Sequence, residues 1–216
     1  MKLAYAALLS MSTILIAALY SGMIISAGLR INSVLLPRKE WILTNNGQWV
    51  LGWWLWLFAI FCWMVLLATL MWRYSPVHRV ATMLQSGLMI VSAVLAIIGV
   101  LTWMNLLPVV MMQPDDSGQL IPTYVALVDT FATSLLAAGC LMGGGVTAWI
   151  GLDLLRLQKL PSTWLAPAII AGLLIVPAPF FLPNPYPLIV AATVWVGWCL
   201  FVATRRAEPP AFPEIL

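Results

Sequence analysis

Asp129 is the residue of this sequence most able to do chemistry, because it is a carboxylate directly before a long apolar run. Residues 130–152 contain no Asp, Glu, Lys or Arg. A charged side chain costs about 2.5–3.5 kcal/mol at the centre of a membrane helix and less near the interface. We therefore expect Asp129 to face the inside of a helix bundle and to meet a polar partner, either Arg30 or the side-chain amide of Asn105.

Asp129 allows two interpretations. It is an ion or proton site that opens outward, or it is part of a structural ion pair that fixes the register of the helices. A proton relay needs a second carboxylate within the membrane, and the sequence offers none, so the structural interpretation is favoured. In the functional interpretation, seven residues would line or adjoin an outward-opening cavity: Asp129, Arg30, Asn105, Thr130, Thr133, Gln85 and Ser92.

Four tryptophans follow one face of the helix predicted over residues 49–72. Trp49, Trp53, Trp56 and Trp63 stand at positions i, i+4, i+7 and i+14. Tryptophan usually gathers at the two membrane interfaces, but Trp56 and Trp63 fall toward the middle of the apolar run. Three occupants fit this aromatic face: a partner protein, a hydrophobic pigment, quinone or sterol, and lipid or a neighbouring helix of the same chain.

The sequence lacks the residues of a self-contained catalytic or metal site. Its single histidine, His78, excludes a bis-histidine haem and a three-histidine zinc site within the chain. It has no Gly-x-Ser-x-Gly, no Ser-x-x-Lys and no phosphate-binding Gly-rich loop with a Lys. We therefore predict that the protein is not an enzyme and that it holds no metal and no cofactor, with a hydrophobic pigment or quinone as the alternative.

The residues above fall on helices that the composition assigns to a membrane. Hydrophobic residues make up 63% of the 216 residues and charged residues only 8%, against about 25% charged in soluble domains. A helix needs about 20 apolar residues to cross a bilayer. The sequence predicts an all-α, polytopic transmembrane bundle within residues 1–206. Its six spans cover about 3–29, 49–72, 80–107, 123–152, 164–181 and 188–204, and a Pro-rich extended cytoplasmic tail follows over 207–216.

The helix over 123–152 is expected to be central. Small residues recur along it at steps of three and four, and Gly139 and Gly143 form a Gly-x-x-x-Gly pair. Small residues allow neighbouring backbones to approach closely in a membrane. Near the far end of this helix, Asp153 is expected to pair with Arg156 at the surface.

The basic residues predict the orientation. With six spans, one side carries seven Lys and Arg residues and the other side three, in the first connector alone. The positive-inside rule then places both termini in the cytoplasm. The net charge of +3 comes without a basic cluster, which argues against nucleic-acid binding.

These observations favour a non-catalytic integral membrane protein of a bacterial cytoplasmic (inner) membrane or an equivalent energy-transducing membrane. We expect a scaffold or accessory subunit of a larger complex, which contacts other membrane subunits or further copies of itself through the Trp-rich helix. A small-molecule or ion permease with a cavity around Asp129 is the first alternative. A binder of a hydrophobic pigment, quinone or sterol along the tryptophans is the second.

Overall fold

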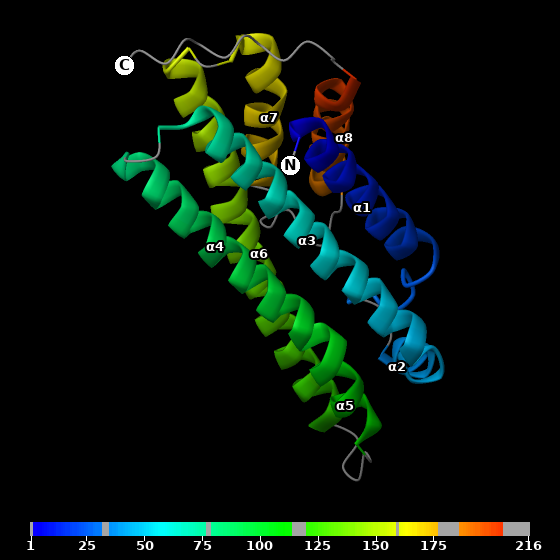
Figure 1. Cartoon of the computed structure of the whole chain (residues 1–216). Coiled ribbons are helices and arrows are strands. Elements are labelled where there is room, and N and C mark those ends of the chain that lie inside the picture. Colours follow the sequence, from blue (N-terminus) through cyan, green and yellow to red (C-terminus); the bar gives the residue numbers. More distant parts are fainter. Residues whose placement is uncertain are drawn as a thin grey trace.

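A computed structural model describes residues 2–31, 35–76, 79–113, 120–158, 160–176 and 186–204, and in these segments all regular secondary structure is helical (Figure 1). Four helices are long and apolar enough to cross a membrane: Leu3–Met23, Asn46–Tyr74, Val80–Met112 and Ile121–Arg156. The prediction of an all-α membrane bundle is confirmed. The predicted tail over 207–216 and His78 lie outside the described residues.

The helices follow one another in the order α1 (Leu3–Met23), α2 (Leu35–Thr44), α3 (Asn46–Tyr74), α4 (Val80–Leu101), α5 (Leu107–Met112), α6 (Leu120–Arg156), α7 (Ser162–Ile175) and α8 (Tyr186–Thr204). A π-helical turn, Thr102–Leu106, joins α4 to α5. Several bounds differ from the predicted spans. The first connector contains the helix α2, and α1 and α7 end at Met23 and Ile175, before the predicted limits of 29 and 181. The helix predicted to end at 107 continues to Met112.

The helices pack as a ring in which each contacts the next. The neighbours are α1 and α3, α3 and α4, α4 and α6, α6 and α7, α7 and α8, and finally α8 and α1. Successive long helices run in opposite directions, so that α1 begins and α8 ends at the same end of the bundle (Figure 1). The short helices α2 and α5 lie together at the opposite end, which we call the α2 end.

Glycines set the closest helix contacts. A Cβ added to Gly144 of α6 would lie 2.5 Å from the carbonyl oxygen of Gly172 in α7, and a Cβ on Gly139 would lie 3.1 Å from Ala96 of α4. No side chain larger than hydrogen fits at the first position without moving a backbone. The prediction that α6 has closely packed neighbours is confirmed by these glycine contacts with α4 and α7. Its central position is not confirmed, because α6 lies in the ring between α4 and α7.

The π-helical turn has a cause in the sequence. Pro108 has no backbone N–H, so it cannot donate to a carbonyl in the preceding turn. In a π-helix each carbonyl pairs with the amide five residues later, and five residues after Trp103 comes Pro108. The carbonyl oxygen of Trp103 is therefore left open for a partner from another helix.

Two buried clusters stabilise the two ends of the ring. One gathers apolar residues of α1, α3, α6, α7 and α8, such as Leu66, Ile150 and Trp198. The other lies at the α2 end and includes Ile42, Trp49 and Met111. The second cluster surrounds the candidate functional site.

Candidate functional site

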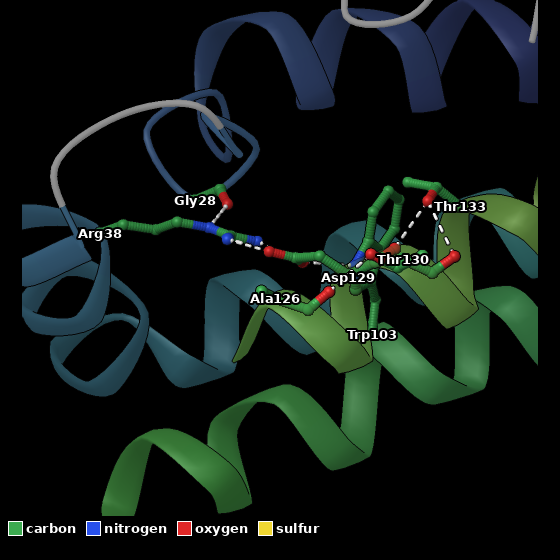
Figure 2. Close-up of polar contacts among 7 residues, drawn as sticks. All are labelled: Gly28, Arg38, Trp103, Ala126, Asp129, Thr130 and Thr133. Atoms are coloured by element: carbon green, nitrogen blue, oxygen red, sulfur yellow. Dashed lines mark hydrogen bonds and ion pairs between the residues drawn. The ribbon is translucent and has the colours of Figure 1, made fainter. Parts of the chain in front are cut away.

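Asp129 and Arg38 form a buried ion pair at the α2 end of the bundle (Figure 2). Arg38 Nη2 donates to Asp129 Oδ1 at 2.8 Å, and Nη1 donates to Oδ2. The indole Nε1 of Trp103 donates to Oδ1 at 2.9 Å. Asp129 is 4% exposed and Arg38 is 3% exposed, so both charges are withdrawn from solvent and neutralise each other.

Three elements far apart in the sequence hold this pair. Asp129 comes from the first third of α6, Arg38 from the first turns of α2, and Trp103 from the π-helical turn. Arg38 Nε also donates to the main-chain carbonyl oxygen of Gly28 at 2.7 Å. The guanidinium therefore ties α2 and the segment after α1 to α6.

Gly28 must be a glycine for this arrangement to close. A Cβ at this position would lie 2.7 Å from the ring of Trp49 and 3.0 Å from that of Trp41. The bare backbone lets both indoles approach while its carbonyl oxygen faces Arg38. A side chain here would push the tryptophans or the guanidinium out of place.

Trp49, Trp53 and Trp103 form a stack behind the ion pair. The Trp49 and Trp53 rings lie 5.3 Å apart edge to face, and those of Trp53 and Trp103 lie 5.1 Å apart. Trp49 Nε1 donates to the open carbonyl oxygen of Trp103 at 3.1 Å. Such ring pairs add about 0.5–1.5 kcal/mol beyond the area that they bury, so the stack fixes the indole that holds Asp129.

The predicted partners of Asp129 were wrong. Arg38, rather than Arg30, reaches the carboxylate, and Trp103 takes the place expected for Asn105. Arg30 is exposed, and Asn105 is exposed on a different face, where it lines a separate shallow hollow with Ile98. The prediction failed because the span bounds leave residues 30–48 outside any helix, whereas in α2 one turn of helix places Arg38 and Ile42 on the buried face.

A cavity of about 330 Å³ adjoins the ion pair. Its described lining comes from the segment after α1, from α2 and from the first part of α6: Ile31, Leu35, Arg38, Pro122, Val125, Ala126, Asp129, Thr130 and Thr133. Asp129, Thr130 and Thr133 thus line one cavity, as the sequence predicts. Whether this cavity binds a ligand stays a prediction.

The other residues expected at this cavity lie elsewhere. Ser92 of α4 donates to the carbonyl oxygen of Gly139 at 2.8 Å and so joins α4 to α6. Gln85 lies two turns nearer the other end of α4, fully buried, and both its amide atoms lack a hydrogen-bond partner in the described part of the chain. These two residues do not line the cavity.

The aromatic face expected on α3 points into the bundle. Trp49 and Trp53 are buried, Trp56 Nε1 donates to Ser21 Oγ at 2.8 Å, and a Cβ on Gly143 would lie 3.4 Å from the Trp63 ring. The expectation of a contact surface is corrected for Trp49 and Trp53, because residues of the same chain cover them. Trp56 and Trp63 are half-buried, and a partner contact there stays a prediction. Binding of a pigment or quinone near Trp56 and Trp63 stays a prediction.

A different row of aromatic side chains faces outward from α3. Trp54, Phe58 and Phe61 are each more than half exposed, and Trp72 follows at the far end of the same helix. The spacing of i, i+4 and i+7 places the first three on one stripe. We call Trp54, Phe58, Phe61 and Trp72 the outer aromatic stripe.

A second ion pair closes the opposite end of α6. Arg79 Nη1 donates to Asp153 Oδ1 at 3.0 Å and to Oδ2 at 2.9 Å. The expected partner, Arg156, was therefore wrong, because the N-terminal end of α4 packs closer to Asp153. Asp129 and Asp153 are twenty-four residues apart on one helix, hence about 36 Å, which is close to the thickness of a bilayer core of about 30 Å.

The polar groups of this site are bound mainly to one another, which does not favour a catalytic role. Among the described residues, no three His, Cys, Asp or Glu side chains come together as a metal site requires. The carboxylate already has three donors, and its charge is neutralised by a guanidinium. What the arrangement offers a ligand is the cavity beside it, which has polar groups at one end and apolar side chains at the other.

Comparison of the chain with protein-family models, with curated proteins and with solved structures finds no match.

Proposed function

We propose that this chain is a non-catalytic integral membrane protein that acts as a scaffold or accessory subunit of a larger membrane complex. The observation that carries the proposal is the outer aromatic stripe on α3. On the neighbouring helix α4, every large exposed apolar side chain is aliphatic or a methionine, whereas α3 presents Trp54, Phe58, Phe61 and Trp72.

The physical basis is the side-chain conformational entropy that is lost when a helix contact forms within lipid. Apolar burial gives no driving force there, so helices associate through van der Waals packing and hydrogen bonds. Flat aromatic rings supply a large packing area with only two side-chain torsions to fix, and they are enriched in protein interfaces. The interior supports the same role, because ion pairs at both ends of α6 stiffen the ring that displays this stripe.

Site-specific photocrosslinking in native membranes tests the proposal. A photoreactive residue in place of Phe58 should give an adduct with a second protein or a second copy of this chain. The same residue in place of Val94, an exposed position on α4, is the matched control. Phe61→Leu, one turn from Phe58, should weaken the adduct. Lipid adducts alone at Phe58, or equal protein adducts at both positions, would refute the scaffold proposal.

We further propose that α7 and α8 also cross the membrane, which makes six crossings with both termini in the cytoplasm of a bacterial inner membrane. Two features support this topology. The chain alternates in direction through all six helices of the ring (Figure 1), and the side that would face the cytoplasm carries seven Lys and Arg residues against three. A green fluorescent protein fused after Leu216 should fluoresce, and alkaline phosphatase fused there should be inactive. The reverse pattern would contradict the topology.

The cavity beside Asp129 favours a second candidate function, a small-molecule permease that opens at the α2 end. Asp129, Thr130 and Thr133 supply polar groups to one wall of that cavity. The test is Asp129→Asn. Loss of solute uptake by proteoliposomes, with expression and thermal stability retained, would support the permease. Loss of folding would assign Asp129 to the architecture instead.

A further inference from the structure

We infer that the cavity beside the Arg38–Asp129 pair binds an uncharged polyhydroxyl group, presented by a free polyol or by the headgroup of a neutral glycolipid. The inference names a ligand class for the permease candidate. It rests on that candidate only in placing the binding site at this cavity.

The charge of the cavity argues against an ion. Among the described residues that line it, only Arg38 and Asp129 are charged, and their charges cancel. An anion attracted by the Arg38 guanidinium would lie within a few ångströms of the Asp129 carboxylate, which would repel it. A cation attracted by the carboxylate would in the same way be repelled by the guanidinium. Moving any ion past Ile31, Leu35 and Val125 would also strip its water, which is far more costly than for a hydroxyl group.

The remaining hydrogen-bonding capacity suits hydroxyl groups. Arg38 has five N–H groups. Three of them bind Gly28 and Asp129, and the other two have no partner among the described residues. Among the acceptors, Asp129 Oδ2 accepts one hydrogen bond, from Arg38 Nη1, and its second lone pair is left to accept another. The hydroxyls of Thr130 and Thr133 donate to carbonyls of α6, at 2.8 Å and 2.7 Å, so their oxygens are left to accept (Figure 2).

Arg38, Asp129, Thr130 and Thr133 therefore bring both donors and acceptors to the described lining of the cavity. A hydroxyl group both donates and accepts, and adjacent hydroxyls on a carbon chain can use both kinds of partner at once. A quinone or a simple ketone has acceptors only, so it could bind guanidinium N–H groups but could donate nothing to the threonine and carboxylate oxygens. A hydrocarbon would use none of these groups.

The shape agrees with a small ligand. The volume of about 330 Å³ is at the lower end of the range of about 300–1,000 Å³ for small-molecule sites. Pro122 and Val125 lie nearer the start of α6, whereas Asp129, Thr130 and Thr133 lie farther along it. The ligand would thus pass an apolar entrance before its hydroxyls reach the polar end.

Binding to the purified full chain tests this inference, in a detergent without a sugar headgroup. One arm measures myo-inositol by saturation-transfer NMR. The other measures a monoglucosyl diacylglycerol in nanodiscs by native mass spectrometry. Binding in the first arm assigns a free polyol, and binding only in the second assigns a lipid headgroup. Either outcome supports the inference if the variants below weaken the binding.

Two variants locate the ligand. Ala126→Leu should fill the cavity, and Thr130→Val with Thr133→Val should remove two acceptors, each with about tenfold weaker binding or more. The matched controls are Ala68→Leu on α3 and Thr193→Val on α8, both at exposed positions outside the cavity. The controls should bind as the unmodified chain does.

Several outcomes would overturn the inference. The first is no binding in either arm. The second is a weakening of ligand binding by the control variants equal to that by the cavity variants. The third is tighter binding of glycerol 3-phosphate than of glycerol. No solute transport is measured in these assays. If binding is found but uptake is absent, the permease candidate fails while the binding site stands.

Discussion

Trp49 donates a hydrogen bond from its indole Nε1 to the main-chain carbonyl oxygen of Trp103, at 3.1 Å. That carbonyl is open because Pro108, five residues later, has no N–H to give it. The bond joins α3 to the π-helical turn, and the indole of the same Trp103 donates to Asp129. One missing amide proton thus creates the attachment point on which the buried carboxylate depends.

Replacing Trp49 with phenylalanine should destabilise the protein. Trp49→Phe keeps an aromatic ring but leaves the Trp103 carbonyl oxygen buried without a partner, at a cost of about 1–3 kcal/mol. The thermal unfolding midpoint in detergent should fall. Trp54→Phe, at an exposed position on the same helix, is the control and should change the midpoint little. An equal effect of both variants would contradict the role given to this hydrogen bond.

Removing one partner of the Arg38–Asp129 pair should be worse than removing both. Either Arg38→Met or Asp129→Leu leaves an uncompensated buried charge, which costs about 3–5 kcal/mol. The double variant leaves no charge, so we expect it to recover most of that loss. Chemical denaturation of the four proteins gives the coupling energy. A double variant as unstable as the sum of the single variants would show that the two side chains do not interact.

Two adjacent glycines of α6 should respond in opposite ways. A Cβ on Gly144 would lie 2.5 Å from the Gly172 carbonyl oxygen, whereas a Cβ on Gly145 meets nothing within 4 Å. Gly144→Ala should therefore push α6 and α7 apart and cost about 1–3 kcal/mol. Gly145→Ala should be neutral or slightly stabilising, because alanine has the higher helix propensity. Thermal unfolding of the two variants checks the prediction, and a larger loss for Gly145→Ala would refute the α6–α7 contact.

Gln85 is a position where an apolar residue should improve the protein. Its amide is fully buried, and neither its oxygen nor its nitrogen has a partner in the described segments. Gln85→Leu removes two unpaired polar atoms, and we expect a gain of about 1–3 kcal/mol in the free energy of unfolding. Ser92→Ala, which removes the bond to Gly139, should instead lose about 0.5–1.5 kcal/mol. A marked loss for Gln85→Leu would mean that this amide binds water or another group.

The sequence by itself determined the solvent and the class of fold. Runs without charge are too long for anything but membrane helices, because an unpaired backbone amide is too costly in lipid. It also determined that Asp129 must be buried with a partner, and that the small residues of α6 mark close helix contacts. These conclusions follow from composition and spacing alone, since they depend on each residue and its nearest neighbours along the helix.

The tertiary structure alone decided which side chains meet. Asp129 and Arg38 are separated by 91 positions, and no local pattern reports a contact over that distance. The sequence also placed Trp49 and Trp53 on one helical face, but the period of a helix does not say which face turns inward. That choice depended on Gly28, whose bare backbone admits the Trp49 ring, and on Pro108, which leaves the Trp103 carbonyl open. Packing between distant segments selects the partner, because a buried polar group is stable only beside the one group that can pair with it.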